Sequence, residues 1–217
     1  MKNKAFIFDL DGVLIDSQSM WHKIERENFP ALFGKEIADK MPNLVGAGVE
    51  AVVSLALSNG SRVSRDEILK KYDEMALAVY ARSKITFGVE KLADKLIAAG
   101  IAIGIVTQSS RIWIDQMLPR LSFRKSIRTI VSIPDNPKLK GKPAPDGYLK
   151  AFKNLNANPQ GSFILEDSNV GIQAGKASGA FTIGYRGNLL PGYEQDGADA
   201  YAFSMDDVIA LIDRTTR

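Results

Sequence analysis

Two aspartates, Asp9 and Asp11, stand two positions apart directly after the apolar run AFIF at residues 5–8, and Gly12 follows them. In an extended backbone, residues i and i+2 project to the same side, so both carboxylates can face one reaction centre. Gly12 permits the tight turn that comes next. Such a pair can supply a nucleophile and a general acid or base, whereas the structural alternative is a polar turn that closes a strand. A calcium-binding loop with Gly12 at its sixth position is excluded, because its first and last positions would not be acidic.

The residue types that the chain lacks narrow the chemistry further. Cysteine is absent, which excludes disulfides, thiolate zinc sites and cysteine nucleophiles. His22 is the only histidine and stands in a polar, helix-like segment, so catalysis by a Ser/His/Asp triad is not expected. We therefore expect carboxylates or lysine to carry any proton chemistry.

Other polar residues also follow apolar runs. Thr107 comes after IAIGIV at residues 101–106, and Glu166 and Asp167 come after SFIL at residues 162–165. Taken singly, such residues are usually helix caps or solvated acids. Ligands of open α/β sheets bind beyond the carboxyl ends of the strands, however, and three such ends here carry polar side chains. Their joint arrangement favours a common site.

A lysine in the segment KLKGKPAPDGYL completes the set. Lys142 is followed by prolines that restrict the backbone and start a helix at about Ala144. An ammonium group is needed wherever a phosphoryl group meets several carboxylates, which alone would repel it. We interpret Lys138 and Lys140 as part of a solvated basic loop.

The elements that position these residues alternate between short apolar runs and helical patterns. Strands are expected at 5–8, 101–106, 129–133, 162–165 and 181–185, and helices at 89–100, 144–155 and 205–214. Residues 18–83 have helical periodicity without a convincing strand. The sequence therefore predicts an α/β fold, a Rossmann-like doubly wound parallel sheet formed by residues 1–17 and 84–217, with an all-helical insertion at 18–83.

The bulk composition is that of a globular protein. The chain has 217 residues, of which 45% are hydrophobic and 24% charged. Lys and Arg number 28 against 25 Asp and Glu, so the net charge of +3 does not indicate nucleic-acid binding. We found no stretch typical of a signal peptide or a membrane span, and we expect a cytoplasmic protein without a membrane partner.

The segments FDLDGVLIDS, TQSS, GKPAPDGYL and LEDSNVGIQAGKASGA resemble, in this order, the four motifs of the haloacid dehalogenase-like (HAD) phosphohydrolases. Within that superfamily the chain resembles the branch that contains β-phosphoglucomutase and many small sugar phosphatases. The resemblance spans nearly the whole chain, and the helical insertion is similar to the cap domain of that branch.

The resemblance implies roles for the strand-end residues. Asp9 is the expected nucleophile that forms an aspartyl phosphate, and Asp11 is the expected general acid and base. Mg²⁺ is the expected cofactor, held by carboxylate oxygens of Asp9 and Asp167 and by the backbone carbonyl of Asp11. Glu166 is expected either as a further ligand or as a group that supports the ligands.

The expected phosphate-binding groups are Thr107, the backbone N–H of Gln108, and Lys142. The cap is expected to close over the site, with hinges near residues 16–17 and 83–87.

The cap sequence bears on the type of reaction. The mutases of the branch carry a histidine at the place of Trp21, and an arginine in the loop that here reads LVGAGVEAV. These departures favour a phosphatase acting on a small phosphorylated metabolite, such as a sugar phosphate or a nucleoside monophosphate, and we expect a monomer. The alternatives are a phosphomutase and a catalytically idle binding or regulatory protein.

Overall fold

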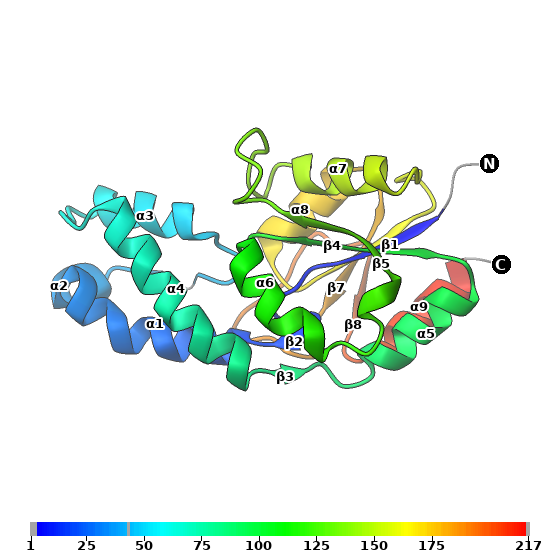
Figure 1. The fold of residues 1–217 in the computed structure, drawn as a ribbon, viewed down its shortest axis with the longest axis horizontal. Coiled ribbons are helices and arrows are strands. Elements are labelled where there is room, and N and C mark those ends of the chain that lie inside the picture. Colours follow the sequence, from blue (N-terminus) through cyan, green and yellow to red (C-terminus); the bar gives the residue numbers. More distant parts are fainter. Residues whose placement is uncertain (1–3, 43, 216–217) are drawn as a thin grey trace.

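A parallel sheet forms the centre of the computed structural model, which describes residues 4–42 and 44–215 (Figure 1). Its strands are arranged in the order β5-β4-β1-β6-β7-β8. In chain order they are β1 (Ala5–Phe8), β4 (Ala102–Thr107), β5 (Ile127–Ser132), β6 (Phe163–Glu166), β7 (Phe181–Tyr185) and β8 (Ala200–Ala202). From the central β1 the chain first builds the sheet outward through β4 and β5, and then returns to the other side of β1 through β6, β7 and β8.

Helices cover both faces of the sheet, and the side chains of β1 alternate between them. Phe6 and Phe8 belong to a core with α5 (Val89–Ala98) and α9 (Met205–Thr215). Ile7 packs on the other face with α7 (Asp146–Asn154) and α8 (Asn169–Ala177). Because β1 is buried on both faces, it reads as an unbroken apolar run. The remaining helices of the core are α6 (Arg111–Met117) and two 3-10 turns, Leu118–Arg120 and Arg124–Ser126.

A helical cap is inserted between β1 and β4 and lies to one side of the sheet in Figure 1. Its helices are α1 (Gln18–Phe33), α2 (Lys35–Ala38), α3 (Val49–Ser58) and α4 (Arg65–Arg82). The longest, α4, begins with a capping box in which Ser64 and Glu67 satisfy each other's backbone N–H groups. The chain enters and leaves the cap through an antiparallel pair of two-residue strands, β2 (Ile15–Asp16) and β3 (Lys84–Ile85).

The fold class expected from the sequence is confirmed, and the differences are local. Thr107 and Glu166 are the last residues of their strands rather than the residues after them, and α7 begins at Asp146, two residues later than expected. The sequence did not predict β2, β3, β8 and α2 as separate elements, because segments of two to four residues are too short to display a period. Helices α6 and α8 were not predicted either.

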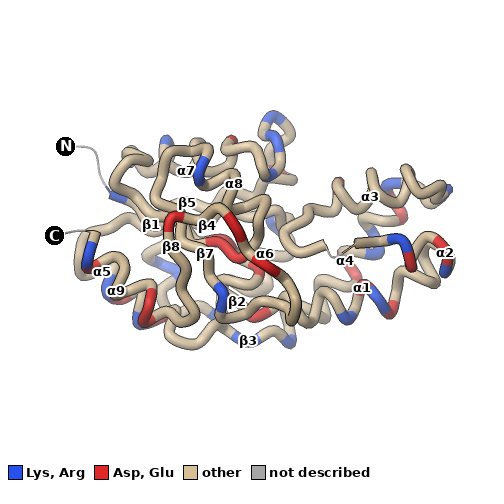
Figure 2. The backbone as a smooth tube through the Cα atoms, turned by 180° about the vertical axis from the view of Figure 1, so that it is seen from behind, with Lys and Arg blue, Asp and Glu red and all other residues tan. Residues whose placement is uncertain are grey.

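Charged residues are dispersed over the chain. Figure 2 shows Lys and Arg positions spread over both the sheet domain and the cap, interspersed with Asp and Glu positions. This dispersal agrees with the small net charge of +3. No helix among the described residues is long and apolar enough to cross a membrane.

Candidate active site

Three buried carboxylates meet at the carboxyl ends of two neighbouring strands. Asp9 follows β1, whereas Glu166 ends β6 and Asp167 follows it. The strands pair in register at Phe8 and Leu165, and the N–H of Asp9 donates to the carbonyl of Leu165 at 3.0 Å. One oxygen from each of the three carboxylates lies within 4.8 Å of the others, and all three residues are at most 6% exposed. The parallel pairing thus creates a dense patch of negative charge.

Lys142 places its ammonium group against this patch from the loop between β5 and α7. Its Nζ lies 2.5 Å from Oδ1 of Asp9 and also contacts Oε1 of Glu166. Burial alone would lower the pKa of Lys142, but the attraction of the two carboxylates outweighs it and raises that pKa. Lys142 therefore stays charged, and one cation faces three acids.

The excess of acids has an electrostatic consequence. Burial is the main cause that raises the pKa of Asp9 above its ordinary value, and the attraction of Lys142 opposes it. Burial, followed by repulsion from Asp9 and Glu166, also raises the pKa of Asp167. Carboxylates so crowded favour the binding of a further cation, and hard oxygen ligands suit a divalent ion such as Mg²⁺.

Glu166 is the most enclosed of the three acids. Its Oε1 accepts hydrogen bonds from Lys142 and from the hydroxyl of Tyr148, and its Oε2 accepts from the N–H and hydroxyl of Ser168 at 3.4 and 3.2 Å. A Cβ at Gly171 would lie 2.0 Å from the carboxyl carbon of Glu166. The start of α8 therefore has room for this carboxylate only because residue 171 is a glycine. Both oxygens of Glu166 are thus occupied by protein donors.

Gly12 makes room for Asp167. Its φ of +76° lies in the left-handed region, and a Cβ there would stand 1.9 Å from Oδ2 of Asp167. The same oxygen accepts a hydrogen bond of 2.7 Å from the side chain of Gln18, at the start of α1. Gly12, which the sequence predicts for a tight turn, is therefore also needed for the carboxylate of Asp167 to fit at the site.

Asp11 accepts hydrogen bonds from four side chains. Its Oδ1 accepts from the hydroxyl of Ser17 at 2.8 Å and from the indole N–H of Trp21 at 3.0 Å. Its Oδ2 accepts from the hydroxyls of Tyr80 and Ser109, both at 2.7 Å. Hydroxyls can donate or accept, so they can adapt to either protonation state of Asp11, whereas an indole N–H can only donate.

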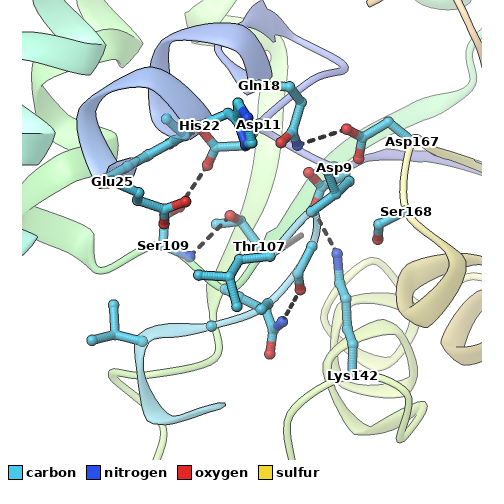
Figure 3. A pocket seen from close by; sticks show the side chains of 18 of the residues that line it. Asp9, Asp11, Gln18, His22, Glu25, Thr107, Ser109, Lys142, Asp167 and Ser168 are labelled. Carbon is cyan, nitrogen blue, oxygen red and sulfur yellow. Dashed lines mark hydrogen bonds and ion pairs between the residues drawn. The ribbon is translucent and has the colours of Figure 1, made fainter. Parts of the chain in front are cut away.

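The other residues expected at the site line the same pocket (Figure 3). Thr107 is 1% exposed, and its hydroxyl accepts from the N–H of Ser109 at 3.0 Å. The side chain of Gln108 donates to the carbonyl of Gly46 in the cap, which brings the cap loop onto the core. Thus Asp9, Asp11, Thr107, Gln108, Lys142 and Asp167 all face one space, and Glu166 lies behind Lys142.

Some residues of this site were not foreseen from the sequence. Gln18, Tyr80 and Tyr148 contact the expected carboxylates from helices α1, α4 and α7. Tyr80 lies 69 positions from Asp11, so no local pattern joins them. Ser109 could have been found, because it belongs to the quoted segment TQSS and follows the strand end of Thr107 by two positions.

The comparisons with known proteins agree with this geometry. A profile of the family "Haloacid dehalogenase-like hydrolase" matches residues 6–185. Hexitol phosphatase B of Escherichia coli K12 is 28% identical over 179 residues, which cover 80% of this chain and 79% of that protein. Validoxylamine A 7'-phosphate phosphatase of Streptomyces hygroscopicus subsp. limoneus is 28% identical over 186 residues, which cover 83% and 84%.

Solved structures show the same fold. CbbY from Rhodobacter sphaeroides, in complex with phosphate, has a TM-score of 0.77 and 24% identity, with 98% of this chain and 100% of that chain covered. A β-phosphoglucomutase from Clostridium difficile has a TM-score of 0.76 and 22% identity, with 98% and 96% covered. The chain belongs to the haloacid dehalogenase-like hydrolases, as its motifs predict, and it is an enzyme of the phosphohydrolase class.

Proposed function

We propose that this chain is a Mg²⁺-dependent phosphatase that hydrolyses a small phosphorylated metabolite through an aspartyl phosphate on Asp9. The observation that carries the proposal is the convergence of Asp9, Asp11, Lys142 and Asp167 on one pocket. A sugar phosphate or nucleoside monophosphate is the expected class of substrate, and the similarity to hexitol phosphatase B supports the first of these.

In the first half of the proposed cycle, a carboxylate oxygen of Asp9 attacks the phosphorus atom and the bond to the ester oxygen breaks. Asp11 gives a proton to that departing oxygen, which leaves as an alcohol. In the second half, Asp11 takes a proton from a water molecule as the water attacks the phosphorus, which releases phosphate and restores Asp9. The four donors around Asp11 hold its carboxylate in place for both transfers.

The phosphoryl group needs positive charge and N–H donors. An ammonium group has three N–H donors, and two of those of Lys142 are directed at Asp9 and Glu166. The third can donate to a phosphoryl oxygen next to Asp9. Thr107 and the backbone N–H of Gln108 line the same space and complete the proposed cradle.

Asp9 and Asp167 are the carboxylates best placed to hold Mg²⁺, together with the backbone carbonyl of Asp11. The enclosure of Glu166 by Lys142, Tyr148 and Ser168 favours a supporting role, in which it orients Lys142. When bound, the ion would neutralise the acids and offset the repulsion between Asp9 and a dianionic phosphate.

The pocket favours hydrolysis over phosphate transfer to a sugar. A mutase must hold a second phosphate, which requires a cation in its outer part. Among the described residues that line the pocket, Lys142 is the only Lys or Arg, and it serves the catalytic end. We propose that residues 18–83 act as the cap, with hinges near residues 16–17 and 83–87.

Substitution of the two aspartates tests the mechanism. Asp9→Asn should abolish phosphate release, because the amide has nearly the same shape but is not a competent nucleophile. Asp11→Asn should slow both halves, so that a good leaving group such as p-nitrophenolate allows a phosphoryl group to accumulate on Asp9, visible by mass spectrometry. Full activity of Asp9→Asn in a correctly folded protein would exclude the covalent mechanism.

The mutase alternative is tested by phosphorus NMR of β-glucose 1-phosphate with a catalytic amount of the bisphosphate. Hydrolysis predicts that free phosphate accumulates, because water competes successfully for the phosphoryl group. Rapid appearance of glucose 6-phosphate with little free phosphate would establish a mutase instead.

A further inference from the structure

One face of α1 forms a wall of the pocket. Gln18, Trp21 and Glu25 recur at the spacing i, i+3 and i+7, and all three line the pocket. Gln18 contacts Asp167 and Trp21 contacts Asp11, so the start of the helix adjoins the catalytic end. Glu25 lies one turn further along, about 6 Å beyond Trp21 along the helix axis. Glu25 thus lines the same pocket on the side away from Lys142 (Figure 3).

The described part of the chain gives Glu25 a neutral hydrogen-bond partner rather than a positively charged one. The hydroxyl of Tyr72 donates to its Oε1 at 2.8 Å. Within residues 4–42 and 44–215, no Lys or Arg forms an ion pair with Glu25. His22, which lines the same pocket, forms none either. Arg26 is exposed and lines an adjoining cavity together with Glu25 and His22, without an ion pair to Glu25. Burial raises the pKa of Glu25 to about 7, with the Tyr72 hydrogen bond opposing the shift. The negative charge of the Glu25 carboxylate is thus balanced by one neutral hydrogen-bond donor and not by an ion pair.

Aromatic rings surround this end of the pocket. Trp21 lies with its ring centroid 5.9 Å from that of Tyr72 and 5.6 Å from that of Trp113, and all three residues line the pocket. Trp21 and Trp113 both stack on Tyr72, so the three rings form an apolar wall beside Glu25. A low local dielectric strengthens the attraction between this carboxylate and a cation. A carboxylate that lies beside several aromatic rings, and that forms no ion pair within residues 4–42 and 44–215, is complementary to a positively charged group.

We propose that the substrate is a phosphate monoester whose organic part carries a protonated amine, which Glu25 and the rings of Trp21, Tyr72 and Trp113 bind. This inference rests on the proposed phosphatase function of the same site. The phosphate occupies the end of the pocket near Lys142, and the ammonium group occupies the end near Glu25. A neutral polyol would leave the charge of Glu25 uncompensated and is the alternative that the test must exclude.

The test compares esters that differ only in this charge. Glucosamine 6-phosphate is paired with N-acetylglucosamine 6-phosphate, and O-phosphoethanolamine with its N-acetyl derivative; phosphate release is measured with Mg²⁺ present. For at least one pair we expect kcat/KM to be about tenfold or more higher for the ammonium ester, as a charge-assisted hydrogen bond in a partly buried site implies. The pair that responds shows whether the amine belongs to a sugar or to a short amino alcohol.

Two variants assign the preference to Glu25. Glu25→Gln keeps the shape of the side chain and its ability to accept from Tyr72, and it should reduce the preference to less than about threefold. Glu27→Gln removes a charge from the exposed side of the same helix, where Glu27 lies 3.9 Å from Lys23, and it should leave the preference unchanged. Thermal melting confirms that both variants are folded.

Two results would overturn the inference: equal or faster turnover of the neutral ester in both pairs, or a preference that survives Glu25→Gln. Hydrolysis of p-nitrophenyl phosphate, which has no amine, tests the proposed phosphatase function independently of the inference. If the wild-type chain hydrolyses the aryl ester but shows no ammonium preference, only the inference about the amine is wrong. If no ester is hydrolysed, both the proposed function and the inference are wrong.

Discussion

The indole N–H of Trp21, in the first helix of the cap, donates to Oδ1 of Asp11 in the core at 3.0 Å. Tyr80, from the last helix of the cap, donates to the other oxygen of the same carboxylate at 2.7 Å. Asp11 is thus held by both ends of the cap. Since cap residues supply half of its four donors, the position of Asp11 depends on the cap resting on the core.

Trp21→Phe should therefore lower kcat for alkyl phosphates by roughly 5- to 30-fold, with a smaller change in KM, because a lost hydrogen bond to a charged group costs about 1–2 kcal/mol. The loss should be smaller for p-nitrophenyl phosphate, whose leaving group needs no proton from Asp11. Steady-state kinetics with both esters checks this. An equal loss for the two esters would show that Trp21 does not act through proton donation by Asp11.

The sequence predicted the residues of the core better than those of the cap. Parallel strands bring their carboxyl ends to one edge, so the positions of Asp9, Thr107, Glu166 and Asp167 at strand ends favoured a common site before any role was assigned. The contact of Tyr80 with Asp11 depends instead on how α4 packs against the core, which no local period encodes. Glu25 was likewise not foreseen, because its position in α1 becomes informative only once the pocket that it lines is known.

A metal ion should stabilise the folded protein. We expect Mg²⁺ to raise the melting temperature, because it binds the folded state and neutralises the crowded acids, and we expect a chelator to abolish phosphate release. Ca²⁺, which is larger and takes more ligands, should support activity poorly. Calorimetry with and without each ion checks the first expectation, and a phosphate-release assay checks the others.

Asp167→Asn should remove the Mg²⁺-dependent rise in melting temperature. Without metal, the variant should be at least as stable as the wild type, because a buried charge next to Asp9 and Glu166 is gone. Asp66→Asn is the matched control, since the side chain of Asp66 is 92% exposed. An undiminished response of Asp167→Asn to Mg²⁺ would contradict the assignment of this ligand.

Gly12→Ala should inactivate the enzyme through Asp167. The added Cβ would lie 1.9 Å from Oδ2 of Asp167, so the carboxylate must move, and the left-handed φ of +76° adds strain of about 1 kcal/mol. Gly100→Ala separates the two effects, because Gly100 has a φ of +69° with nothing within 4 Å of the added Cβ. Both variants should lose similar backbone stability, but only Gly12→Ala should lose phosphate release and the response to Mg²⁺. Activity in Gly12→Ala would refute the packing argument.

The raised pKa of Glu25 should make folding stability depend on pH. Because this pKa rises from 4.5 to about 7, the folded state binds more protons than the unfolded state between these values, and stability falls as pH increases through that range. The effect is on the order of 1–3 kcal/mol, since the group is only partly shielded from solvent. The melting temperature of Glu25→Gln minus that of the wild type should therefore be larger at pH 8 than at pH 5.

Glu27→Gln is again the control, because the side chain of Glu27 is 59% exposed and its replacement should shift the melting temperature by similar small amounts at both pH values. A Glu25→Gln shift that is the same at pH 5 and pH 8 would show that the charge of Glu25 carries no burial cost. A larger shift at pH 8 would mean that the folded chain tolerates an uncompensated carboxylate in its pocket. Such a carboxylate can then be neutralised by a cationic ligand, so an ammonium ester should raise the melting temperature of the wild type more than that of Glu25→Gln.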